Sequence, residues 1–180
     1  MRHFITLIVP SDGVVALDAV MTRHGRRAQP MDNPSVREVL LDGERQYLTT
    51  AGPCDCGTVL GVTPVAAEEL ENDLAREAAR LTRKGWSAAK IARALDDRRR
   101  ADARPKGRDG PDSLDLWTEV LAGLRDGLKL PYAGLLVHAY RGGLEDEIIS
   151  ATRRAVGRGI PHPEGLAALV EDEVTIFPLR

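Results

Sequence analysis

The sequence predicts an α+β protein: a small mixed β-sheet of four to five strands, with a cluster of helices from the middle of the chain packed on one side. Short apolar runs rich in β-branched residues stand near both ends of the chain, as expected of strands. Between positions 64 and 127 the apolar residues recur every three or four positions, which is the spacing of helices with one inward face. The 180 residues, 43% of them hydrophobic, are enough to bury a core, so a single globular domain over residues 1–180 is expected.

The first strand and the first helix are expected near the N-terminus. Residues 4–9 form a continuous apolar run that a Pro-Ser-Asp-Gly turn ends, which predicts a buried strand. Residues 14–21 carry apolar side chains on one side at helical spacing, and Gly25 is a typical helix stop. Residues 26–34 contain two prolines and an Asp-Asn pair, and they are predicted to form an ordered loop.

A β-hairpin is predicted for residues 36–50, because Asp42-Gly43 lies between two short apolar runs and suits a tight turn. Its second strand leads into residues 52–61, GPCDCGTVLG, which hold both cysteines of the chain. This glycine-rich segment separates the short α/β elements before it from the helices after it.

Three helices are predicted in the middle of the chain. Pro64 suits the first turn of one that ends near residue 84, Ser87 caps the second, and Ser113 caps the third. Residues 96–112 are charged and contain proline and glycine, so this segment is expected to be the most mobile. The expected inward residues are Leu70, Leu74, Ala78 and Leu81 in the first helix, Ile91, Ala94 and Leu95 in the second, and Leu116, Trp117, Val120, Leu121 and Leu124 in the third.

The last part of the chain returns to short elements. Strands are predicted for residues 134–140 and 174–177, and a short helix for residues 163–170. Residues 144–156 fit either a helix or a strand. Of two acidic runs, residues 145–147 are expected to begin a helix and residues 171–173 to form a solvated turn.

The composition argues against two classes of partner. A formal net charge of -2 provides no general attraction to nucleic acid or to an anionic membrane. The first apolar run is too short for a signal peptide, and no later run approaches the thickness of a bilayer. With two cysteines and no export signal, we expect a cytoplasmic protein with reduced thiols.

Cys54 and Cys56 are the candidate metal ligands. Residues two apart in an extended segment project on the same side, so the two thiolates could hold one soft metal ion, with zinc as the candidate cofactor. Two other interpretations stay open. The pair could be redox-active, although a disulfide between residues two apart would be strained and easily reduced. Alternatively, both are small side chains that pack beneath a tight connection.

Residues 23–27, Arg-His-Gly-Arg-Arg, resemble the RHGxR fingerprint of the histidine phosphatase family, and residues 48–52 resemble that family's L-T-x-x-G element. The resemblance implies a phosphate-monoester hydrolase in which His24 is the phosphorylated nucleophile and Arg23 and Arg27 clamp the phosphate. It also implies that His138, at the end of a late strand, is a second pocket histidine. The same residues fit a helix C-terminus, where cationic side chains and a glycine stop are typical.

Residues 81–95 resemble the first two helices of DNA-binding helix-turn-helix domains. Such domains continue with a short turn and a recognition helix, whereas residues 96–100 lead into the charged segment. A plain helical hairpin with Trp86 at its corner is the alternative, and no nucleic-acid partner is expected.

No catalytic set in the sequence is complete, so whether the protein is an enzyme stays open. The leading hypothesis is a non-enzymatic protein that binds another protein, as an adaptor, an inhibitor or an immunity protein does. Near-neutral charge and an arginine-rich segment, residues 98–108, would suit an acidic protein partner. The alternatives are the phosphate-monoester hydrolase with His24 and His138, and a metal-binding protein with Cys54 and Cys56.

Overall fold

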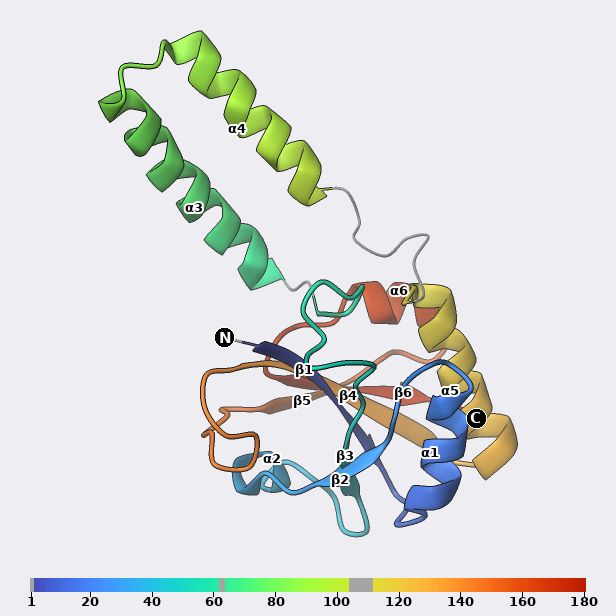
Figure 1. Cartoon of the computed structure of the whole chain (residues 1–180). Coiled ribbons are helices and arrows are strands. Elements are labelled where there is room, and N and C mark those ends of the chain that lie inside the picture. The colour runs from blue at the N-terminus through green and yellow to red at the C-terminus, as the bar shows by residue number, and fades with distance from the viewer. Residues whose placement is uncertain (1, 62–63, 104–111) are drawn as a thin grey trace. The chain divides into compact units, whose positions relative to one another are not determined.

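The structure is a computed structural model that describes residues 2–61, 64–103 and 112–180, except for the side chains of residues 64–70 and 98–103. Contacts divide the chain into two compact units, residues 63–106 and the remainder. The larger unit holds a sheet with helices, and the smaller one is a helical hairpin (Figure 1). The single domain expected over residues 1–180 stays a prediction.

A six-stranded mixed sheet forms the centre of the larger unit (Figure 1). All neighbouring strands are antiparallel except the parallel pair β5–β6. The α+β class is therefore confirmed, with a slightly larger sheet than the four to five strands predicted. In spatial order the strands are β2 (Gln29–Met31), β3 (Arg45–Leu48), β1 (Arg2–Val9), β4 (Tyr132–Tyr140), β6 (Glu173–Pro178) and β5 (Thr152–Ala155).

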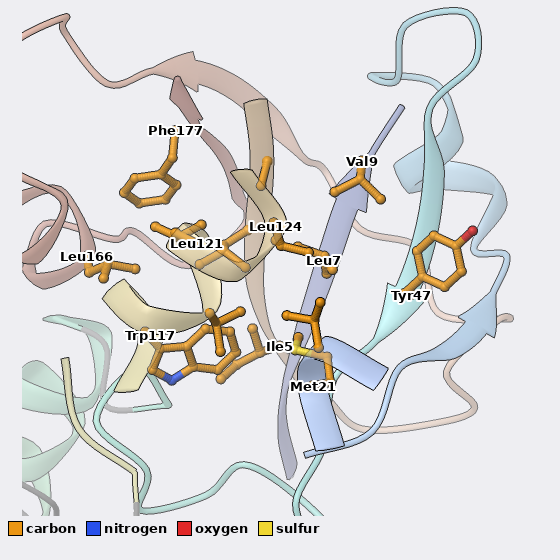
Figure 2. Packing of buried hydrophobic residues seen from close by; sticks show 14 of the residues in the cluster. Ile5, Leu7, Val9, Met21, Tyr47, Trp117, Leu121, Leu124, Leu166 and Phe177 are labelled. Carbon is orange, nitrogen blue, oxygen red and sulfur yellow. The ribbon is translucent and has the colours of Figure 1, made fainter. Parts of the chain in front are cut away.

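One face of the sheet is covered by α1 (Val14–Thr22), α5 (Leu114–Leu128) and α6 (His162–Ala167). Ser113 caps α5 as expected, because its hydroxyl accepts a hydrogen bond from Leu116 N at 3.1 Å. The helix predicted for residues 14–21 is confirmed by α1. Figure 2 shows side chains of α5 beside those of β1 in one cluster; the residues labelled there include Ile5, Leu7, Met21, Trp117, Leu121 and Leu124.

The opposite face carries a second apolar cluster that includes Phe4, Leu136 and Tyr140. It lies beneath α2 (Pro34–Arg37) and residues 141–151, whose Val36, Leu144 and Ile149 pack in the same cluster. Because side chains alternate along a strand, His138 of β4 points to this second face, between its neighbours Leu136 and Tyr140.

The smaller unit consists of α3 (Pro64–Arg83) and α4 (Ala88–Ala103). Leu74 and Leu81 are buried, and Gly85 makes the turn with a φ of +76°. The prediction of a charged loop over residues 96–112 is wrong up to Ala103, because α4 continues to that residue. Alanine and arginine are good helix formers, and no proline or glycine interrupts them before Pro105. Residues 104–111 lie outside the described residues.

The hairpin predicted for residues 36–50 is wrong in its first strand. Asn33 accepts hydrogen bonds from Ser35 N at 3.0 Å and Val36 N at 3.1 Å, and so caps the short helix α2. This helix-start signal, with Pro34 in the first turn, outweighs the β propensity of the residues that follow. The turn at Asp42-Gly43 does form, with Gly43 at a φ of +86°.

Two further expectations need correction. The predicted loop over residues 26–34 contains the three-residue strand β2, which is too short to show an alternating pattern. Residues 145–147 do not begin a helix but lie in a turn, and the strand β5 follows within the segment that fitted either helix or strand.

Candidate functional site

The four residues of the phosphatase resemblance do not share one pocket. His24 lies just after α1, with its Nδ1 3.6 Å from a carboxylate oxygen of Glu119 on α5, and therefore on the first face of the sheet. His138 points to the opposite face. Arg23 is exposed, and Arg27 pairs with Asp18 of its neighbouring helix at 2.9 Å. Gly25 has a φ of +69°, so residues 23–25 end the helix in the usual way.

Both cysteines are free thiols, Cys54 half-buried and Cys56 exposed. The residue between them, Asp55, is 0% exposed and was not singled out by the sequence. Its Oδ1 accepts a hydrogen bond from the buried Arg26 at 2.8 Å, and its Oδ2 accepts one from Ile5 N at 3.0 Å. The CDC stretch is therefore anchored in the protein by its central aspartate.

Arg26 is the centre of a buried charge network. Besides Asp55, its guanidinium donates to Asp112 Oδ1 at 2.8 Å and to the Thr49 carbonyl at 2.7 Å, and it lies 4.5 Å from the Trp117 ring. Burial raises the pKa of Asp55, while the Arg26 charge opposes this shift. Because each of these charges has a partner, the network is best explained as structural.

A different cluster brings a histidine together with three carboxylates. His138, 8% exposed, has its Nδ1 2.5 Å from Asp172 Oδ1, and its Nε2 faces Glu147 Oε1 at 3.6 Å. One ligand atom from each of His138, Glu171 and Asp172 lies within 4.8 Å of the other two. In the described part of the chain, this is the group of three or more histidine, cysteine or acidic residues whose spacing suits a metal ion.

The end of β4 holds these carboxylates in position. The Ala139 N–H donates to Glu171 Oε1 at 2.9 Å, and the Arg141 and Gly142 N–H groups donate to Glu147 Oε2 at 2.8 and 2.7 Å. These two backbone hydrogen bonds lower the pKa of Glu147, so it stays ionised. Asp172 adopts a φ of +61°, and its own N–H donates to the Val137 carbonyl at 3.0 Å. As expected, Asp172 lies in a turn with its side chain 43% exposed, but Glu171 and Asp172 are also hydrogen-bonded to β4.

Three polar atoms beside this cluster are buried and, among the described residues, have no hydrogen-bond partner: His138 Nε2, Tyr140 Oη and Thr6 Oγ1. The Tyr140 ring packs edge-on against the His138 ring, with 4.5 Å between the centroids. Burial, together with Glu147 and Asp172, raises the pKa of Tyr140 to about 12, against the opposing effect of Thr6, so its hydroxyl keeps its proton. Buried polar groups of native proteins are rarely left unpaired, so these three atoms mark the polar part of the second face.

Sequence reasoning found only one member of this cluster. The sequence places His138 at the end of a predicted strand, whereas Glu147, Glu171 and Asp172 belong to acidic runs, which are usually solvated. The carboxylates come together with His138 because Glu171 bridges to Val137 and because residues 141–147 fold back toward β4. No spacing in the sequence encodes either contact.

Comparison of the chain with protein-family models, with curated proteins and with solved structures finds no match. Among the described residues, no helix has both the length and the apolar character needed to span a membrane. The function therefore has to be argued from the geometry of this chain.

Proposed function

We propose that the protein binds a divalent metal ion of the first transition row, with His138, Glu171 and Asp172 as ligands. The observation that carries this proposal is the convergence of their three ligand atoms within 4.8 Å around a histidine that is almost completely buried. Three carboxylates, counting Glu147, surround a single imidazole, and a bound cation would relieve their mutual repulsion.

Each ring nitrogen of His138 has a distinct role in this proposal. Nδ1, on the side of Asp172, is the metal ligand, and the proton then sits on Nε2, which points toward Glu147. A histidine that binds a metal commonly donates its other N–H to a carboxylate, which orients the ring and makes it a better ligand. Glu147 is suited to this role because two backbone N–H groups already hold its other oxygen.

The mixed ligand set favours particular ions. An imidazole nitrogen suits Zn²⁺, Fe²⁺ and related ions, whereas Mg²⁺ and Ca²⁺ prefer sites built from oxygen alone. Two carboxylates and one histidine also suit Mn²⁺, and thiolates bind Mn²⁺ poorly. Mn²⁺ is therefore the probe that separates this site from the cysteine pair.

Isothermal titration with Mn²⁺ tests the proposal. We expect one ion per chain, no competition from equimolar Mg²⁺, and loss of binding in Asp172→Asn. Glu147→Gln should weaken binding by roughly 10–100-fold, as removal of an outer carboxylate partner does. Glu145→Gln, an exposed carboxylate of the same turn, is the matched control and should bind as the wild type does.

Equal Mn²⁺ binding by the wild type and Asp172→Asn would overturn the proposal. So would an absence of binding by a folded wild-type protein. The contact between His138 and Asp172 would then be a plain ion pair.

A protein-binding role, the leading hypothesis from the sequence, remains our second proposal, and the helical hairpin supports it. Of the residues expected to face inward, Ile91, Ala94 and Leu95 of α4 stay half-buried. A hollow of about 490 Å³ on this helix is lined by Ala92, Arg93, Leu95 and Asp96. Half-buried apolar positions beside arginine side chains are typical of interaction surfaces.

A pull-down from native lysate tests this second proposal. An acidic protein partner should be recovered in stoichiometric amount, and Leu95→Ser should abolish its recovery. Ala89→Ser, on an exposed position of the same helix, is the control. A pull-down that returns no stoichiometric partner counts against the role. We also propose that the protein is located in the cytoplasm, because both of its cysteines are free thiols.

A further inference from the structure

The segment that carries the cysteines is held rigidly at the start of β1. The Asp55 N–H donates to the His3 carbonyl at 2.7 Å, and the Asp55 carboxylate accepts from Ile5 N at 3.0 Å. The carboxylate is also paired with Arg26, which is 1% exposed. Movement of the segment would break these three contacts of Asp55, so they hold its backbone in place.

This anchoring decides where the two thiols lie. Asp55 points inward, whereas the half-buried Cys54 and the exposed Cys56 interact through a hydrogen bond between their thiols. The two thiols lie close enough for Cys54 to affect Cys56: burial first, and then the neighbouring Cys54 thiol, raises the pKa of Cys56. The His3 N–H donates to Cys56 Sγ at 3.2 Å, an interaction that favours negative charge on this sulfur.

Among the described side chains, the two sulfurs have no further metal ligand nearby. In the side chains that the structure describes, no third histidine, cysteine or carboxylate lies with them at a spacing that suits a metal ion. A stable zinc site in a protein needs four ligands, or three and an open position. The pair provides only two, both of them soft.

We propose that Cys54 and Cys56 bind one monovalent soft metal ion, copper(I), between their two sulfurs. Copper(I) is a soft ion that thiolates select, and two thiolates are enough to complete its coordination. Each thiol loses its proton when its sulfur binds the ion, so one copper(I) displaces two protons and leaves a complex of net charge −1. The His3 N–H stabilises the added negative charge on Cys56. This site is independent of the one at His138, because the two share no residue.

Competition with a colorimetric copper(I) chelator, in the absence of oxygen, tests the proposal on the whole chain. We expect the wild type to withdraw one copper(I) ion per chain from the chelator, and each of Cys54→Ser and Cys56→Ser to lose this ability by at least tenfold. The apparent affinity should rise with pH, because two protons are released. Asp172→Asn, which removes a ligand of the other proposed site, should retain copper(I) binding.

A second measurement separates loss of the site from loss of the fold. Thermal unfolding followed by circular dichroism should give similar midpoints for the wild type and both serine variants without metal, and copper(I) should raise the midpoint of the wild type alone. The proposal is overturned if the folded wild type leaves copper(I) with the chelator. It is also overturned if a single serine variant binds as tightly as the wild type, or if one equivalent of Zn²⁺ displaces the copper(I).

Discussion

Replacing Arg26 with methionine would leave the most deeply buried carboxylate of the described chain without its charge partner. The side chains of Arg26 and Asp55 are 1% and 0% exposed, so solvent cannot take over the role of either. Removing one partner of a buried ion pair costs about 3–5 kcal/mol, mostly because the remaining charge is stranded. Methionine has a similar length and restores part of the packing against Trp117, so the expected loss in the free energy of unfolding is about 3–5 kcal/mol and not more.

The pH dependence of this loss identifies its cause. Burial already raises the pKa of Asp55 in the folded protein above the unfolded value, and Arg26→Met removes the charge that opposes the shift. A raised pKa in the folded state means that the stability contribution is present below the unfolded pKa and is lost as the pH rises through the folded pKa. The destabilisation by Arg26→Met should therefore be largest at neutral pH and smaller in acid.

Urea unfolding of Arg26→Met and wild type at several pH values measures this effect. The control is the same substitution in an Asp55→Asn background, where only the partly exposed Asp112 loses its charge partner, and there we expect a clearly smaller loss. The reasoning is refuted if Arg26→Met costs the same in both backgrounds, or if its cost does not fall in acid.

Two further predictions concern other parts of the sheet-containing unit. A Cβ at Gly61 would lie 2.1 Å from the Asp55 carbonyl oxygen, whereas a Cβ at Gly52 would meet nothing within 4 Å. Gly61→Ala should therefore destabilise the protein several times more than Gly52→Ala, as measured by thermal unfolding. The carboxylate of Glu44 accepts hydrogen bonds from Arg153 at 2.7 and 2.8 Å, so Arg153→Met leaves a buried carboxylate without its partner. The free energy of unfolding should fall by about 2–3 kcal/mol, less than for a fully buried pair because Arg153 is partly exposed. Burial tends to raise the pKa of Glu44, but Arg153 and the Leu41 N–H outweigh burial and lower this pKa. The stability that the Glu44–Arg153 pair provides is therefore lost as the pH falls through the pKa of Glu44 in the folded protein. The unfolding curves of the variant and the wild type should converge in acid.

The proposed ion sites differ in the hardness of their ligands, and this difference makes them separable in one preparation. His138 with two carboxylates should accept Mn²⁺, and the cysteine pair should accept copper(I), so each ion reports on one site. A variant of either site provides the control for the other.

The elements that sequence reasoning predicted correctly are those whose information is local. The run at residues 4–9 is continuously apolar and ends at a turn, as expected of a buried strand. The helix α1 has apolar residues at helical spacing and a stop at Gly25, and α5 has such spacing and a cap at Ser113. The wrong predictions arose where two local signals competed, as at Val36, where the cap formed by Asn33 prevailed over β propensity. Short strands such as β2 and β5 exist only because a neighbouring strand offers hydrogen bonds, and no signal within three or four residues records that.

The sequence by itself determined the mixed α+β class and the helical stretch in the middle of the chain. The contacts between charged side chains were decided by the tertiary structure alone. It paired Asp55 with Arg26, separated His24 from His138 by a sheet, and brought Glu147, Glu171 and Asp172 to one imidazole. The physical reason is that helices form from contacts between near neighbours in the chain, whereas strand pairing and a cluster of charges depend on which distant segments the core packs together.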